Sequence, residues 1–162
     1  MFYNKFWFSI VFLLSFQMLF CQELPPIVKY NPATYGAGNQ NWMISQDKND
    51  FIYFANNEGL LEYNGTTWSL YPSPNETIIR SVNVIDNKIY TGCYMEFGYW
   101  IRQSNGQLKY TSLSKSLKNK IQDDEQFWNI LNYDQWVIFQ SLNKIFIYDT
   151  KSGNFNIIDP KN

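Results

Sequence analysis

A pattern of four short apolar stretches, separated by turns, recurs three times in this chain of 162 residues. The clearest turn is Asn64-Gly65, because both residues tolerate the positive φ angles of a tight hairpin. Leu60 and Tyr99 are equivalent positions 39 residues apart, and Ile145 follows Tyr99 after 46 residues. Repeats of about 40 residues with four strands each are typical of β-propeller blades. The sequence therefore predicts an all-β fold, a partial β-propeller of about three four-stranded antiparallel blades.

The predicted strands and domains follow directly from this repeat. We expect strands at 42–46, 51–55, 60–63 and 67–71, then at 78–85, 88–93, 97–102 and 108–112, and finally at 127–131, 136–140, 144–148 and 155–158. The blades then span about residues 39–74, 75–113 and 125–162, with a short polar insertion at 114–124. Residues 22–38 precede the first blade and are expected to form an extended segment.

The predicted second strand of the first blade is apolar on both faces. Phe51 and Tyr53 would point to one side of the sheet, and Ile52 and Phe54 to the other. A strand with one wet face alternates apolar and polar residues, so both faces must be covered, as they are when blades pack face to face. We therefore expect the aromatic residues, 19% of the chain, to fill the wedges between blades and not to form a carbohydrate-binding platform.

The N-terminus has the layout of a secretory signal peptide. Lys5 is followed by an almost uninterrupted apolar run, residues 6–20, which ends at the small residue Cys21. The run is shorter than the ~20 residues that a membrane-spanning helix needs, and two prolines follow it closely. We therefore expect residues 1–21 to be a cleaved signal peptide and the protein to be exported. An uncleaved anchor and lipid attachment at Cys21 are the alternatives.

The composition excludes several classes of function. The chain has no histidine, which removes His-ligated metal sites and nucleophile pairs that depend on imidazole. The formal net charge of -1 gives no electrostatic basis for nucleic-acid binding. We expect no catalytic residues, no metal, no cofactor and no nucleic-acid contact by this segment.

Two local features could be taken for chemical sites. The acidic residues 123–125 lack the alternating oxygen ligands and the glycine of a calcium loop, so we predict a solvated loop there. Cys93 is the one thiol that remains after cleavage behind Cys21, and it lies in an apolar, strand-like stretch. We expect Cys93 to be a small buried hydrophobic side chain.

Residues 35–71 carry a more specific pattern, YGAGNQNWMISQDKNDFIYFANNEGLLEYNGTTWSLY. A strand ending in Gln-Asp, an aromatic strand, an Asn-x-x-Gly-Leu turn and an Asn-Gly turn follow in this order. The pattern resembles the first blade of the two-component regulator propeller family of Bacteroidota sensor proteins. Residues 96–100, EFGYW, resemble the second blade of the subgroup in which the propeller leads to a three-tyrosine domain, a membrane helix and a cytoplasmic regulator.

The resemblance implies a periplasmic sensor whose signal reaches a histidine kinase or a helix-turn-helix output across the membrane. This chain ends at Asn162 after three blades, whereas complete propellers have about four to eight. We therefore expect it to be the N-terminal part of a longer protein, or a truncated copy. The remaining blades and the downstream domains would then be its partners and would tether it to the membrane.

Propellers place ligands where loops converge at one end of the axis. The loops between second and third strands carry polar side chains there, and six of them are the candidate ligand-binding residues: Asn56, Asn57, Glu58, Tyr94, Glu96 and Asn143. These groups can hydrogen-bond a small molecule, a glycan or a peptide. The alternative is that they only satisfy backbone groups of the turns.

Three hypotheses of function remain after these exclusions. The preferred hypothesis is a non-enzymatic, exported sensor or ligand-binding module. The alternatives are an exported propeller enzyme, a lyase or glycosidase that uses carboxylates and tyrosines, and a protein-interaction propeller fragment. The lack of histidine weakens the enzyme hypothesis without eliminating it.

Overall fold

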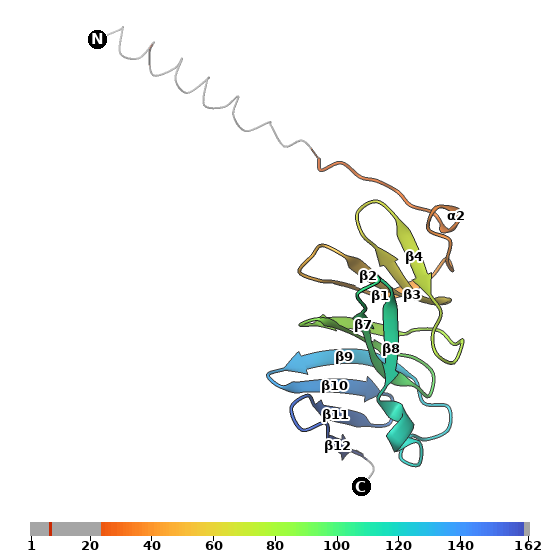
Figure 1. Cartoon of the computed structure of the whole chain (residues 1–162), viewed down its shortest axis with the longest axis vertical. Helices are drawn as coiled ribbons and strands as arrows, with labels where there is room; N and C mark the ends of the chain where they lie inside the picture. Colours follow the sequence, from red (N-terminus) through yellow and green to blue (C-terminus); the bar gives the residue numbers. More distant parts are fainter. Residues whose placement is uncertain (1–6, 8–23, 161–162) are drawn as a thin grey trace.

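The computed structural model describes residue 7 and residues 24–160, and these residues contain three four-stranded antiparallel sheets (Figure 1). The first sheet contains β1 (Asn41–Gln46), β2 (Ile52–Asn56), β3 (Gly59–Tyr63) and β4 (Trp68–Tyr71). The second contains β5 (Ser81–Ile85), β6 (Lys88–Gly92), β7 (Phe97–Arg102) and β8 (Leu108–Ser112). The third contains β9 (Phe127–Tyr133), β10 (Trp136–Ser141), β11 (Ile145–Asp149) and β12 (Phe155–Ile158).

Each sheet is a meander in which every strand pairs with the next one along the chain. The sheets are stacked in chain order, and their first strands adjoin one another, β1 against β5 and β5 against β9 (Figure 1). This arrangement confirms the predicted all-β fold with three four-stranded antiparallel blades. The largest difference in strand limits is at β5, which begins at Ser81 and not at residue 78.

The segments outside the blades differ from prediction. Within residues 22–38, expected to be extended, Pro32–Tyr35 form a helical turn, α2, whose N-terminus is capped by the Asn31 side chain. The insertion at 114–124 contains the 3-10 helix η1 (Ser114–Leu117), and Leu117 and Ile121 are buried. The insertion is therefore not simply polar, because two apolar side chains anchor it. The predicted signal peptide, apart from residue 7, lies outside the described residues.

Two hydrophobic cores lie between neighbouring blades. The first interblade core consists of Tyr53, Ala55, Leu60, Ile79, Val82, Ile89, Cys93, Trp100 and Leu108. The second interblade core consists of Tyr90, Phe97, Leu117, Ile121, Phe127, Ile130, Val137, Phe139, Phe146 and Tyr148. Ile89 and Tyr90 are adjacent on β6, yet they belong to different cores. This is why the second strands are apolar on both faces, since successive side chains of a strand point to opposite sides.

The inner strands of adjacent blades approach one another closely. Ser45 Oγ accepts a hydrogen bond from Val84 N at 3.0 Å, and Ser81 Oγ donates one to Phe127 O at 2.8 Å. A Cβ atom added at Gly92 would lie 2.7 Å from the Cβ of Phe127, so only glycine fits at that point. These contacts fix the spacing of the blades at their inner edges.

The outer face of the first blade carries an aromatic cluster from three parts of the chain. Trp68 on β4 stacks on Tyr63 with ring centroids 4.3 Å apart. Tyr30 and Tyr35, from the segment before β1, contact the same indole, with ring centroids 5.2 and 5.6 Å from that of Trp68. The N-terminal segment therefore covers part of this face.

Of the residues that the structure describes, none belongs to a helix with the length and apolar character required to cross a membrane.

Candidate functional site

The loops that follow β2, β6 and β10 emerge at one end of the stacked blades, beside the connections that lead from one blade to the next. We call this the loop end; it comprises residues 56–59, 92–97 and 141–145 and the connections 72–80 and 113–126. Backbone hydrogen bonds join loops to connections, from Ile79 N to Asn56 O at 3.2 Å and from Met95 N to Glu125 O at 2.7 Å. The structure therefore brings the predicted ligand-binding loops to one end of the molecule.

Asn56 does not present its side chain to a ligand, contrary to the sequence-based expectation. The residue is completely buried. Its Nδ2 donates to Gly38 O at 2.7 Å and to Asn41 Oδ1 at 2.8 Å, while its Oδ1 accepts from the backbone N atoms of Gly38 and Glu58. The amide binds the segment before β1 to the end of β2, so its hydrogen-bonding groups are already used.

Glu96 is half-buried and has a structural role. Its Oε1 accepts hydrogen bonds from Tyr110 OH at 2.9 Å and from Ser112 Oγ at 2.7 Å. Burial raises the pKa of Tyr110 far above its ordinary value, and the charge of Glu96 raises it further, so the phenol stays protonated and donates. Glu96 therefore ties the loop after β6 to β8.

We expect Glu96→Ala to lower the free energy of unfolding by about 1–3 kcal/mol, because two partly buried hydroxyls lose their acceptor. Glu58→Ala is the matched control, since Glu58 is an exposed carboxylate in the corresponding loop and should change stability by less than about 0.5 kcal/mol. Urea denaturation followed by circular dichroism measures both. Equal effects of the two substitutions would contradict the structural role of Glu96.

The other four candidates stay near the surface of the loop end. Glu58 is exposed, and Tyr94 is 38% exposed. Asn57 is half-buried, and its Oδ1 accepts a hydrogen bond from Trp42 Nε1 at 2.8 Å. Asn143 is half-buried in the β10–β11 turn, where its backbone N donates to Ser141 Oγ. These four residues remain candidates for contact with a ligand.

The sequence predicts a solvated loop at residues 123–125, but the structure shows that only part of this segment is exposed. Asp123 and Asp124 are exposed, but Glu125 is buried. Ser141 Oγ donates to Glu125 Oε1, and Gln122 N donates to Glu125 Oε2 at 3.0 Å. Glu125 thus joins the connection between the second and third blades to the end of β10.

Sequence reasoning missed a cluster at the inner edge of the loop end, which we call the Trp42–Arg80–Trp128 cluster. The Arg80 guanidinium lies over the ring of Trp42 at 4.1 Å and over that of Trp128 at 4.9 Å. Each of the three residues comes from a different blade, at or just before its first strand. The repeat pattern could not predict this cluster, because it does not reveal that Trp42 and Trp128 lie beside the same arginine in the folded protein.

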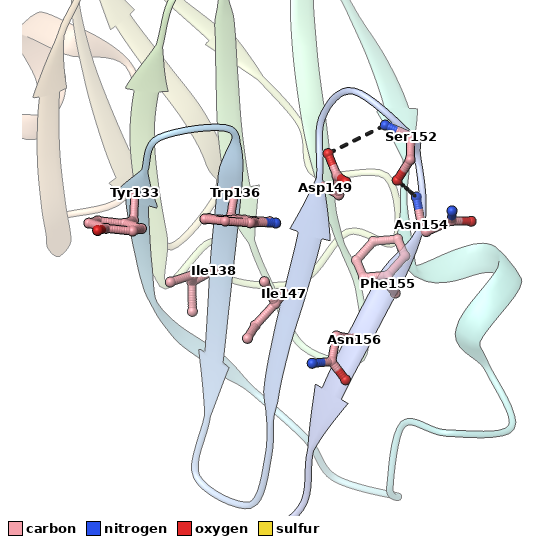
Figure 2. A pocket seen from close by; sticks show the side chains of 9 residues that line it. All are labelled: Tyr133, Trp136, Ile138, Ile147, Asp149, Ser152, Asn154, Phe155 and Asn156. Atoms are coloured by element: carbon pink, nitrogen blue, oxygen red, sulfur yellow. Dashed lines mark hydrogen bonds between the residues drawn. The ribbon is translucent and has the colours of Figure 1, made fainter.

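The outer face of the third blade carries an open groove of about 610 Å³ (Figure 2). Its lining residues are Tyr133, Trp136, Ile138, Ile147, Asp149, Ser152, Asn154, Phe155 and Asn156. The rings of Tyr133 and Trp136 are nearly parallel, at 7°, and Tyr133 is 69% exposed. The corresponding faces of the first and second blades are covered by the next blade, so this groove lies where a further blade would pack.

Neither a metal centre nor a reactive thiol stands out among the described residues. They contain no group of three or more Cys, Asp or Glu side chains arranged to hold a metal ion. Cys93 is completely buried in the first interblade core, as predicted, and burial raises the pKa of its thiol far above the ordinary value.

Comparison with known proteins identifies the fold. The search found no matching family model and no matching curated protein. Solved structures do match, among them the following two. Both contain the extracellular domain of BT4673 from B. thetaiotaomicron, described in one as a hybrid two component system and in the other as a one component system.

The similarity is structural, with 18% sequence identity in both cases. The TM-scores are 0.58 and 0.56, over 76% and 74% of this chain. The chain spans only 16% and 15% of the length of the two solved chains. The three blades therefore have the fold of part of that extracellular domain.

Proposed function

We propose that this chain is part of an exported sensory β-propeller, a non-enzymatic ligand-binding module of a bacterial two-component-type regulator. The observation that supports this function is the match between its stacked blades and the extracellular domain of the BT4673 system. The residue pattern of the first two blades favours the two-component regulator propeller family.

The open face of the third blade supports a longer protein. Ile138 and Ile147 lie on this face beside the Tyr133–Trp136 pair, and all four are accessible to a packing partner (Figure 2). Burying a large apolar side chain is worth about 1.5–3 kcal/mol, so a further blade would gain stability by docking there. The remaining blades and a downstream signalling domain are therefore its proposed partners.

The proposed location is the periplasm, and two independent observations favour it. The apolar N-terminal run has the layout of a signal peptide. The solved structures that resemble the chain are extracellular domains. The proposed ligand is a small molecule, glycan or peptide that binds at the loop end.

The test is a transcriptional reporter for the regulator in cells that carry the full protein, supplied with a panel of oligosaccharides and short peptides. We expect one ligand class to induce the reporter and Glu58→Gln with Tyr94→Ala to reduce that induction. Gln103→Ala is the matched control, because Gln103 is exposed at the opposite end of the blades. Reporter induction in this variant should equal that of the unaltered protein.

A second measurement separates a sensor from an enzyme. Purified protein is incubated with the inducing ligand, and the ligand is analysed by chromatography. We expect it to be recovered unchanged. Conversion to an unsaturated or hydrolysed product would instead support the lyase or glycosidase alternative.

A further inference from the structure

Two donors in the Trp42–Arg80–Trp128 cluster are buried without a partner. Arg80 Nε donates to Gln126 Oε1 at 2.8 Å, but Arg80 Nη1 has no hydrogen-bond acceptor among the described residues. Trp128 Nε1 is in the same situation. Buried polar groups are nearly always hydrogen-bonded, and leaving one unpaired is destabilising. A hydrogen-bond acceptor placed between these two donors would therefore stabilise the cluster.

The charge of Arg80 points to an anionic acceptor. Within the described part of the chain, no carboxylate oxygen lies within ion-pairing distance of its guanidinium, whereas Arg102 is paired with Glu62. The two indole faces hold the Arg80 guanidinium by cation–π contacts without neutralising it. A guanidinium held in this way can bind a carboxylate through two parallel hydrogen bonds.

The backbone directs both indoles toward the arginine. The β1–β2 pairing skips Trp42, because Asn41 pairs with Asn56 and the next pair begins at Met43. The β9–β10 pairing skips Trp128 in the same way. Each tryptophan thus occupies a β-bulge near the start of the innermost strand of its blade. Bulges redirect side chains and are frequent beside functional sites.

The cluster adjoins the surface residues of the loop end. Trp42 is 37% exposed, and on the loop side its indole is held by the hydrogen bond to Asn57. Gln126, which binds Arg80, forms an isolated β-bridge with Tyr94, a second exposed aromatic residue. A ligand that displaced the Trp42 indole would reach Arg80 and would retain aromatic surface for stacking.

We infer that the Trp42–Arg80–Trp128 cluster is the recognition site for the carboxylate of an acidic sugar. The carboxylate accepts from Arg80 Nη1 and Trp128 Nε1, and the sugar ring stacks on the displaced Trp42 indole or on Tyr94. This inference deepens the proposed sensor function and rests on it, because it names the ligand class of the same loop end.

The test measures binding of digalacturonic acid and of digalactose, its carboxyl-reduced counterpart, to the full chain by calorimetry and tryptophan fluorescence. We expect the acid to bind about tenfold or more tightly than the neutral disaccharide, because the two differ only in the groups that Arg80 recognises. Arg80→Met should make the two affinities equal. Lys48→Met is the control, since it removes one positive charge from an exposed turn at the opposite end and should leave the preference intact.

A second variant keeps the proposal testable if Arg80→Met does not fold. Asn57→Ala releases the Trp42 indole, so the affinity for the acid should rise by about fivefold with a larger fluorescence change. Equal binding of acid and neutral sugar by the unaltered chain would overturn the proposal, as would preferential binding of a Glu-Glu dipeptide. The reporter response to other ligands would still stand, so failure here is distinct from failure of the sensor function.

Discussion

Replacing Phe97 by alanine should lower the free energy of unfolding by about 3–5 kcal/mol, the range observed when a buried phenylalanine is truncated. Phe97 is completely buried on β7, in the second interblade core. Its ring lies 4.4 Å from that of Phe139 and 4.6 Å from that of Phe127, both of which belong to the third blade. The cavity would therefore open between two blades and loosen their packing, as well as that of β7 itself.

Urea denaturation followed by near-ultraviolet circular dichroism measures this loss. Typical domains have a net stability of about 5–15 kcal/mol, so Phe97→Ala should leave only a marginally folded protein. Phe97→Leu fills more of the space and should cost less than about 2 kcal/mol. Tyr133→Ala is the surface control, because Tyr133 is 69% exposed. A Phe97→Ala protein as stable as the Tyr133→Ala protein would contradict the assignment of this core.

The repeat predicts the blades well because each one is built from local signals. Strand limits follow from short apolar runs and from turns such as Asn64-Gly65, whose positions depend on nearby residues only. The packing of blades follows from the same runs, since strands that are apolar on both faces must be covered on both. Ile89 and Tyr90 illustrate this, as neighbours that enter different cores.

The candidate site was harder to predict, because contacts with residues distant in sequence decide which of its side chains are buried and which are exposed. Asn56 and Glu58 look equivalent in the sequence, as polar residues of one loop, yet Asn56 is buried by Gly38 and Asn41 while Glu58 is exposed. Arg80 looks like an ordinary surface cation until Trp128, 48 residues later, is placed beside it. A repeat indicates where loops meet, but it does not reveal which of their side chains are buried and hydrogen-bonded to backbone groups.

The contact between Arg102 and Glu62 provides the second strong test, because it joins the third strands of the first two blades. The Glu62 side chain is only 6% exposed, and Arg102 Nη2 donates to its Oε2. The same guanidinium donates to Tyr53 OH at 3.0 Å and lies 4.4 Å from the ring centre of Phe51. The ion pair therefore forms part of the boundary between the two blades.

Arg102→Met should lower the free energy of unfolding by about 3 kcal/mol, since it leaves the Glu62 carboxylate buried without its counter-charge. Adding Glu62→Leu should recover most of this loss, because a well-packed apolar pair can replace a buried ion pair at little cost. Thermal and urea denaturation of the single and double variants measure the coupling. The penalty comes from the buried charge and not from loss of arginine packing, so a double variant no more stable than Arg102→Met would refute this explanation.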